Sequence, residues 1–251
     1  MKSTLRQRLR PLLALPLLVF LAHAHAQDSA GTHWGLGAGA GYREVPFNGG
    51  GARFGALPYF FFDNSWLHAE GTTLDLKLGS THGLDFTLRG KYALEDRRTD
   101  SLAASLNGMD QRHGAFQIGP TVRWHSDLGI ASAAFLVAGD KGQQLVLDYT
   151  KPFQYGAWTL SPYVGVRWLS DSYVDYYYGV RSSEARPGRP AYDGNSTYEL
   201  SLGSRFRYQF TPHQSVMFDL GVARLGSGIT DSPIVGRQYV PRASIGYLYQ
   251  F

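Results

Sequence analysis

Apolar and polar residues alternate along most of this chain, which is the spacing of extended β-strands. In the terminal segment 243–251, one face carries Ile245, Tyr247, Tyr249 and Phe251, and the other carries small or mostly polar residues. The same alternation recurs at 84–94, 116–124, 198–210 and 216–225, where the polar face includes ionised side chains. These segments are predicted to be strands that separate an apolar environment from a wet one.

Alternation alone does not distinguish a soluble β-sandwich from a transmembrane β-barrel. In a sandwich the apolar faces meet in a core, whereas in a barrel they meet lipid and the charged faces line the interior. A secretory signal and an aromatic final strand favour the barrel here. We therefore predict an all-β fold, a single antiparallel transmembrane β-barrel, closed because lipid offers free backbone groups no partner.

Eleven segments are predicted as strands: 34–42, 53–62, 66–78, 84–94, 115–125, 130–138, 143–150, 158–170, 196–210, 215–225 and 242–251. Single-chain barrels usually have an even number of strands, so one of these predictions must be wrong. The prediction most open to error is segment 66–78, because Glu70 interrupts its apolar face. An additional strand within 93–112 would also make the number of strands even. We expect about 12 strands, with 10 as the alternative. Pro120 and Pro162 should mark bulges or strand ends.

The first 26 residues have the features of a cleaved signal peptide. A basic start precedes the apolar run 12–22, and Ala-His-Ala at 24–26 fits a cleavage site, so the predicted mature chain is 27–251. The whole formal excess of +4 lies in this leader, at Lys2, Arg6, Arg8 and Arg10. The mature chain is therefore neutral and has no surplus charge for binding nucleic acid.

Catalytic and cofactor chemistry have little support in the sequence. The chain has no cysteine, which excludes disulfides, thiol nucleophiles and a lipid anchor on cysteine. Its histidines show no metal-binding spacing. His125 and Ser126 are adjacent on a strand and point to opposite faces, which suits no base–nucleophile pair. We expect no catalytic residue, no metal and no cofactor.

Charged residues on the polar faces of the strands are candidates for the barrel lumen. In an open pore such charges set ion selectivity, whereas in a narrow bore they pair across strands and fill space. We favour paired filling and keep the pore as the alternative. The candidates are Asp85, Arg89, Lys91, Arg123, Arg167, Glu199, Arg205, Arg207 and Asp219.

Long polar links at 95–113, 171–195 and 226–241 alternate with short turns, and long links face outward in barrels of this kind. Four stretches carry a resemblance to a known family: 160–165 (LSPYVG), 176–180 (YYYGV) with Glu184 and Tyr192, 231–235 (DSPIV) and 246–251 (GYLYQF). Over about residues 34–251 the chain resembles the MltA-interacting protein/OmpV family of outer-membrane proteins.

The resemblance implies a non-enzymatic scaffold in the bacterial outer membrane. The founding member is named for binding a membrane-bound lytic transglycosylase and is linked to a bifunctional murein synthase. It implies a murein hydrolase and a murein synthase as partners, besides outer-membrane lipid. Other members are described as porin-like proteins or adhesins, so a small-solute porin or channel and a surface adhesin are the alternatives.

Two motifs in the long links are candidate partner contacts. The alternative for the tyrosines is an interfacial aromatic girdle or packing of the loop onto the barrel rim, and for the second motif a simple turn. We favour these alternatives. The candidates are Tyr176, Tyr177, Tyr178, Gly179, Val180, Glu184, Tyr192, Asp231, Ser232 and Pro233. Separately, Tyr247, Tyr249 and Phe251 resemble the terminal signal read by the barrel-insertion machinery.

Overall fold

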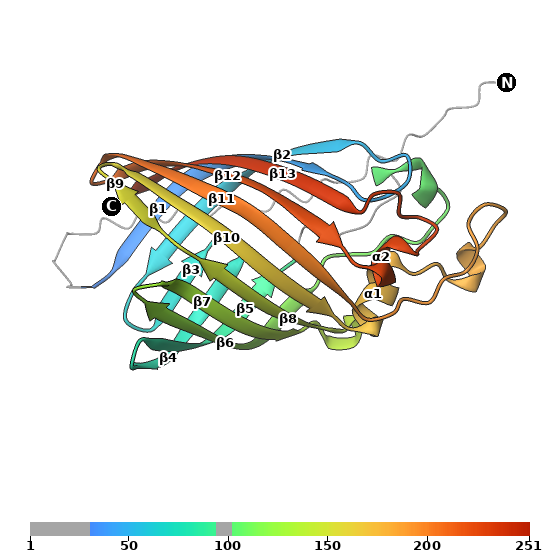
Figure 1. Cartoon of the computed structure of the whole chain (residues 1–251), viewed down its shortest axis with the longest axis horizontal. Helices are drawn as coiled ribbons and strands as arrows, with labels where there is room; N and C mark the ends of the chain where they lie inside the picture. Colours follow the sequence, from blue (N-terminus) through green and yellow to red (C-terminus); the bar gives the residue numbers. More distant parts are fainter. Residues whose placement is uncertain (1–30, 94–101) are drawn as a thin grey trace, which may run out of the picture. The chain divides into compact units, whose positions relative to one another are not determined.

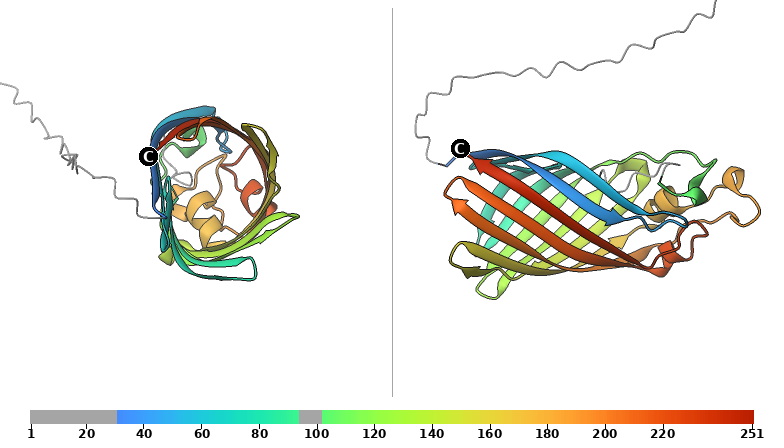
Figure 2. Two further views of the ribbon diagram at one scale, coloured as in Figure 1. Left: turned by 90° about the vertical axis from the view of Figure 1, so that its left-hand side faces the viewer. Right: turned by 90° about the horizontal axis from the view of Figure 1, so that it is seen from above.

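The computed structural model describes residues 31–93 and 102–251, so the predicted signal peptide 1–26 lies outside the described residues. The strands form a closed antiparallel barrel (Figures 1 and 2). Strands that follow one another along the chain pair as neighbours, and the last strand pairs with the first from Gly35 opposite Gln250 to Arg43 opposite Arg242. Closure leaves the seam between the two chain ends fully paired.

The barrel has twelve strands, which confirms the expected count. Two short segments, β8 and β9, pair in succession with β10 and form one barrel strand that is interrupted at Lys151 and Pro152. The strands are β1 (His33–Glu44), β2 (Ala52–Asp63), β3 (Leu67–Glu70), β4 (Thr73–Thr81), β5 (Leu84–Tyr92), β6 (Phe116–Ser126), β7 (Gly129–Val137), β8 (Gln143–Thr150), β9 (Phe153–Tyr155), β10 (Trp158–Leu169), β11 (Thr197–Thr211), β12 (Gln214–Leu225) and β13 (Tyr239–Gln250).

The suspect segment 66–78 is not one strand but parts of two. The chain turns at Gly71, whose φ is +59°, so that β3 pairs back onto β4. Glu70, which broke the predicted phase, is the last residue of β3. Splitting this segment supplies the twelfth strand, and the described part of 93–112 contains no strand, only a short 3₁₀ turn, η2 (Ala104–Leu106).

The two prolines do not lie at bulges, contrary to the expectation. The bulges of the described strands are at Gln209/Thr211 and Lys77/Gly79. Pro120 lies where the pairing of β6 with β7 skips two residues, and Pro162 lies opposite the break between β8 and β9. A proline lacks one donor, so an interrupted ladder on one side tolerates it without any bulge.

The alternation of the strands sorts side chains by environment. Leu202, Leu220 and Ile245 are among many large apolar residues exposed on the outside of the barrel. Contiguous apolar exposure of this kind is unfavourable in water and is what contact with lipid requires. No described helix is long and apolar enough to cross a membrane.

The two ends of the described chain meet at the end of the barrel that carries the short turns. The Trp34 and Phe251 rings stack there with centroids 4.0 Å apart, and the Phe251 N–H donates to the Trp34 carbonyl. The long links gather at the opposite end (Figure 2). We call their described residues the cap: 45–51, 102–115, 138–142, 170–196 and 226–238. In barrels of this class short turns face the periplasm, so we expect the cap on the extracellular side of the membrane.

Candidate functional site

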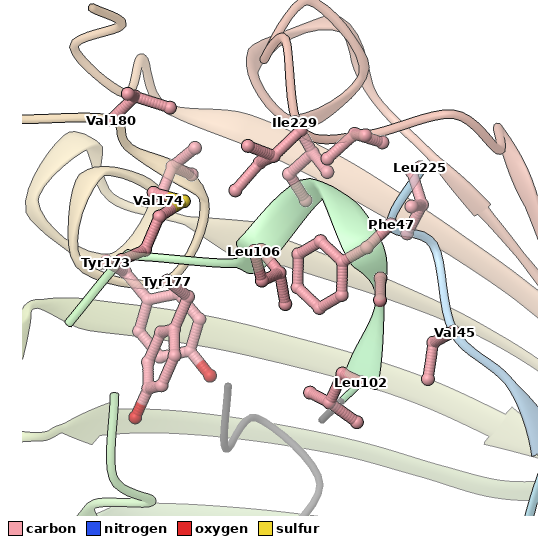
Figure 3. Close-up of a cluster of buried hydrophobic side chains, with 14 of the residues drawn as sticks. Val45, Phe47, Leu102, Leu106, Tyr173, Val174, Tyr177, Val180, Leu225 and Ile229 are labelled. Atoms are coloured by element: carbon pink, nitrogen blue, oxygen red, sulfur yellow. The ribbon is translucent and has the colours of Figure 1, made fainter. Parts of the chain in front are cut away.

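The cap has its own hydrophobic core (Figure 3). The apolar face of the barrel wall points towards lipid. The buried apolar cluster of the described chain therefore lies in the cap, at the outer mouth of the barrel. Figure 2, viewed along the barrel, places the cap helices inside the ring of strands. The core residues are Val45, Phe47, Leu102, Ala103, Leu106, Met109, Leu169, Tyr173, Val174, Tyr177, Val180, Leu225, Ile229, Ile234 and Val235.

Helix α1 (Asp171–Tyr178) supplies the centre of that core. The Ser170 hydroxyl accepts the Tyr173 N–H at 3.2 Å, which satisfies one of the free donors at the helix start. Tyr173, Val174 and Tyr177 share one helix face and are buried. At Gly179, where the helix ends, a Cβ would lie 2.3 Å from the Asp175 carbonyl oxygen, so a side chain does not fit.

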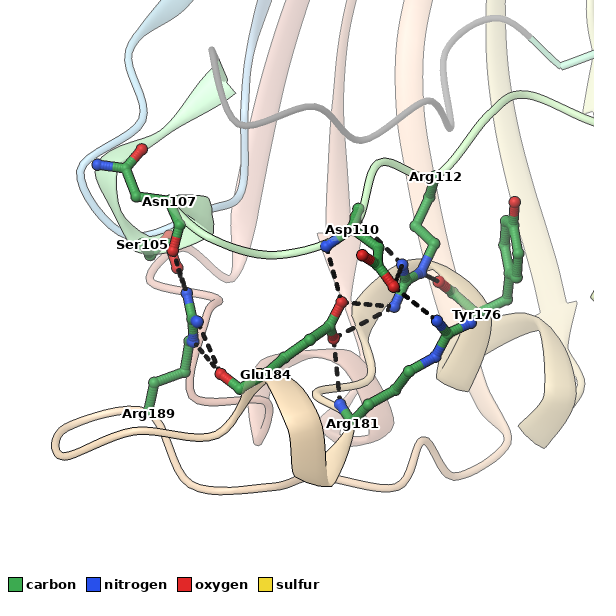
Figure 4. Close-up of polar contacts among 8 residues, drawn as sticks. All are labelled: Ser105, Asn107, Asp110, Arg112, Tyr176, Arg181, Glu184 and Arg189. Atoms are coloured by element: carbon green, nitrogen blue, oxygen red, sulfur yellow. Dashed lines mark hydrogen bonds and ion pairs between the residues drawn. The ribbon is translucent and has the colours of Figure 1, made fainter.

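Glu184 joins two segments of the cap, 102–115 and 170–196, by ionic and hydrogen bonds (Figure 4). It lies in the 3₁₀ turn η4 (Ser182–Glu184). Both oxygens of its carboxylate accept from Arg112 Nη2, at 3.1 and 3.2 Å. The carboxylate also accepts the backbone N–H groups of Asp110 and Arg181. The side chains of Arg112 and Glu184 are each only 4% exposed. A buried pair of this kind is held by its surrounding hydrogen bonds.

A second buried arginine ties the same turn to η2. Arg189 donates to the Glu184 carbonyl at 2.7 Å and to the carbonyls of Ser105 and Asn107 at 2.8 and 3.0 Å. Burial, reinforced by nearby Arg186, lowers the pKa of the Arg189 guanidinium. These backbone contacts tie links far apart in the sequence into one folded unit.

The ten candidate contact residues all lie in the cap, and the two motifs touch each other. Ser232 Oγ donates to the Tyr178 carbonyl at 2.6 Å, and Tyr192 Oη donates at 2.8 Å to the carbonyl of Gly228, in the short helix α2 (Ser227–Thr230). Burial raises the pKa of the Tyr192 phenol. Val180 pairs with Tyr192 through two backbone bonds of 2.9 Å.

The remaining candidates differ in exposure. Tyr176 is half-buried, and its ring receives the Lys141 ammonium 5.1 Å from the centroid. The Pro233 carbonyl accepts from Asn48 Nδ2, and Asp231 is exposed at the end of α2. The motifs therefore contribute much of the packing that shapes the cap.

The nine predicted lumen charges lie on the inward-facing positions of their strands, and several are paired. Arg89 makes two bonds of 2.7 Å to Asp75, Arg167 Nε donates to Glu199 at 2.7 Å, and Asp85 lies 3.0 Å from His125 Nε2. Arg205 lies 3.5 Å from Asp219. Arg207 contacts the Met217 sulfur, Lys91 lines the cavity described next, and Arg123 lies opposite Asp85 in register.

Beneath the cap the lumen contains a cavity of about 360 Å³. Cap residues, Phe47, Tyr177 and Tyr178 among them, form its outer wall. Its basic lining residues are Arg43, Arg89, Lys91, Arg167 and Arg242, and its acidic ones are Glu44, Asp148 and Glu199. No group of three or more histidine, aspartate or glutamate residues in the described ranges could hold a metal ion.

Sequence reasoning missed several of these lumen residues. Asp75 was missed because 66–78 was predicted as a single strand with one apolar face. Leu74, Leu76 and Leu78 alternate with Asp75 and could have shown the second strand. Arg43 lies just beyond a predicted strand, and Arg242 was the first residue of another. Arg112 carried no local signal, because its carboxylate partner lies 72 residues away.

A closed antiparallel barrel with a lipid-facing apolar exterior, a charged lumen and a folded cap over one mouth defines an outer-membrane β-barrel protein. Residues 36–251 match the family described as MltA-interacting protein MipA. The chain belongs to this family, as its motifs had suggested.

Two curated relatives and one solved structure illustrate the likeness. The chain is 29% identical to the MltA-interacting protein of Escherichia coli (strain K12), over 96% of this chain and 98% of that protein. It is 28% identical to outer membrane protein OmpV of Vibrio cholerae, over 82% and 75%. The translocator domain of autotransporter NalP from Neisseria meningitidis aligns over 90% of each chain with 10% identity and a TM-score of 0.43.

Proposed function

We propose that this protein is a non-enzymatic outer-membrane scaffold that holds a murein-remodelling enzyme at its periplasmic end. The observation that supports this best is the cap, which folds at the outer mouth of the barrel around a buried apolar core and a buried ion pair. A barrel plugged by a folded core is poorly suited to passing solutes. The name of the Escherichia coli relative, MltA-interacting protein, supports a protein partner.

Under this proposal the docking surface lies away from the cap motifs. Murein enzymes work in the periplasm, on the side of the short turns. Leu128, in the turn between β6 and β7, is an apolar residue there that is 70% exposed. We propose that the turn end around Leu128 contacts the enzyme and that the cap motifs serve the cap itself.

Co-purification with a lytic transglycosylase tests the scaffold. The barrel, extracted in detergent, should retain the enzyme, and Leu128→Glu should reduce its recovery severalfold. The matched control is a short insertion after Gly188, an open position of the cap where a Cβ would meet nothing within 4 Å. That insertion should leave recovery unchanged. Failure of the wild-type barrel to retain any murein hydrolase or synthase would overturn the proposal.

A solute channel is the second candidate, because the lumen is charged and partly exposed. The Arg205 side chain is 53% exposed although it faces inward. Planar-bilayer recordings decide between the two: the scaffold account expects no conductance steps from the wild-type barrel, and regular steps favour the channel.

A further inference from the structure

Four arginines lie along one side of the lumen, from one end of the barrel towards the other. Arg207 and Arg205 lie on β11, Arg242 on β13 and Arg43 on β1, in order from the short-turn end towards the cap. We call these four residues the arginine track. The two upper residues, Arg242 and Arg43, line the cavity beneath the cap. The track therefore leads from the short-turn end of the barrel to this cavity.

The upper part of the track places like charges face to face. Arg242 is directly opposite Arg43 across the closing seam, and Arg43 is directly opposite Arg53 on β2. Like charges at directly opposed positions destabilise a sheet. Three arginines in one row across three strands therefore form a band of positive charge that attracts an anion placed beside it.

Among the described residues, an acidic side chain beside the track is shared between its arginines. Asp219 is shared by two arginines, since its oxygens lie 3.5 Å from Arg205 Nε and 3.9 Å from Arg242 Nε. Of the described residues that line the cavity, more are basic than acidic. Two guanidinium groups around one carboxylate leave donors directed at the lumen, because each guanidinium carries five N–H groups.

Tyr163 holds two of these arginines in place. Its hydroxyl donates to Asp219 at 2.9 Å and accepts from Arg242 Nη2 at 3.1 Å. Arg205 and Arg242 lie 6.0 and 5.8 Å from the centroid of its ring. The ring itself lies against Gly203 and Gly221, where a Cβ would be 2.3 and 2.5 Å from the hydroxyl oxygen. The guanidinium groups are thus positioned before any ligand arrives, which reduces the cost of binding.

We propose that the arginine track and the cavity form a binding site for small carboxylate-bearing solutes that enter from the periplasm. Planar guanidinium groups match carboxylates in a two-pronged geometry. The side chains of Arg205 and Arg242 are 53% and 46% exposed, so a solute in the lumen can reach them. This site is independent of the scaffold proposal, because it needs no protein partner.

Calorimetric titration of the refolded barrel in detergent tests the site. D-glucuronate and citrate are the anionic probes, and D-glucose is the neutral match for glucuronate. We expect saturable binding of at least one anion, no binding of glucose, and weakening as salt is raised. Arg242→Gln and Arg205→Gln should each weaken binding about tenfold. Arg242→Lys, which keeps the charge and loses the fork, should fall between.

Arg224→Gln is the matched control, because Arg224 lies at an outward position of β12 opposite Leu200 and Tyr239. It should bind the anion like the wild type. Each variant is first shown to migrate as a folded, heat-modifiable barrel. The proposal is overturned if no anion binds the wild type, if glucose binds as well as glucuronate, or if Arg224→Gln has the effect of Arg242→Gln. None of these results bears on enzyme recovery in the co-purification.

Discussion

Replacing Glu184 by alanine is expected to unfold the cap while the barrel stays closed. The change leaves the Arg112 guanidinium buried without its carboxylate and removes the acceptor of two backbone N–H groups. Breaking a buried ion pair by removing one partner costs about 3–5 kcal/mol. A cap of this size has no large reserve of stability to absorb such a loss.

Two measurements follow this change. Trypsin should cut the variant rapidly in the cap, at the bond between Arg181 and Ser182, while the strands remain resistant. In planar bilayers the variant should show conductance steps that the wild type lacks. Asp110→Asn is the control, because its main ion pair is exposed: Asp110 and Arg181 are 67% and 58% exposed and lie 2.9 Å apart, whereas Arg112 is 3.9 Å from the Asp110 carboxylate. Such surface pairs contribute about 0–1 kcal/mol. A Glu184→Ala barrel as resistant and silent as the wild type would show that this network does not hold the cap.

Gly37→Ala is expected to prevent closure of the barrel. Gly37 faces inward on β1, and a Cβ there would lie 1.9 Å from the Tyr247 carbonyl oxygen of β13. That oxygen belongs to the backbone, so the two strands must separate at the seam that joins the chain ends. We expect a loss of about 3 kcal/mol, seen as failure to form the compact, heat-modifiable species on gels.

Gly41→Ala is the matched control for the seam. It lies on the same strand and the same face, but its nearest neighbour, the Ala243 carbonyl oxygen, would be 3.6 Å from the new Cβ, an ordinary contact. This variant should fold like the wild type. Equal folding of the two variants would mean that β1 and β13 approach less closely than the structure has them.

The barrel could be predicted from the sequence because the alternation within each strand shows which of its faces is apolar and which is polar. Alternation at 198–210 or 216–225 depends on neighbouring residues only, so the strand and its lipid face are visible locally. The boundary at Gly71 was missed because a two-residue turn barely interrupts an alternating pattern, and the odd strand count was the sign of the error. The total of twelve then follows because single-chain barrels usually have an even number of strands.

The cap and the arginine track could not be predicted, because their contacts join distant segments. Ser232 and Tyr178 are 54 residues apart, and the Glu184 network reaches back to Arg112. Polar link residues carry no periodicity that indicates a core. Arg43 and Arg242 face each other only because the last strand pairs with the first in one particular register, which is a property of the whole barrel.

The most direct test of the account is the sidedness of two epitope insertions. One follows Gly188 in the cap and the other follows Gly156 in the turn between β9 and β10; both glycines have positive φ and open space around the Cβ position. An antibody is too large to cross an intact outer membrane. The account predicts that intact cells bind it through the Gly188 insertion, and through the Gly156 insertion only after permeabilisation. Binding at Gly156 on intact cells would place the cap in the periplasm and contradict the account.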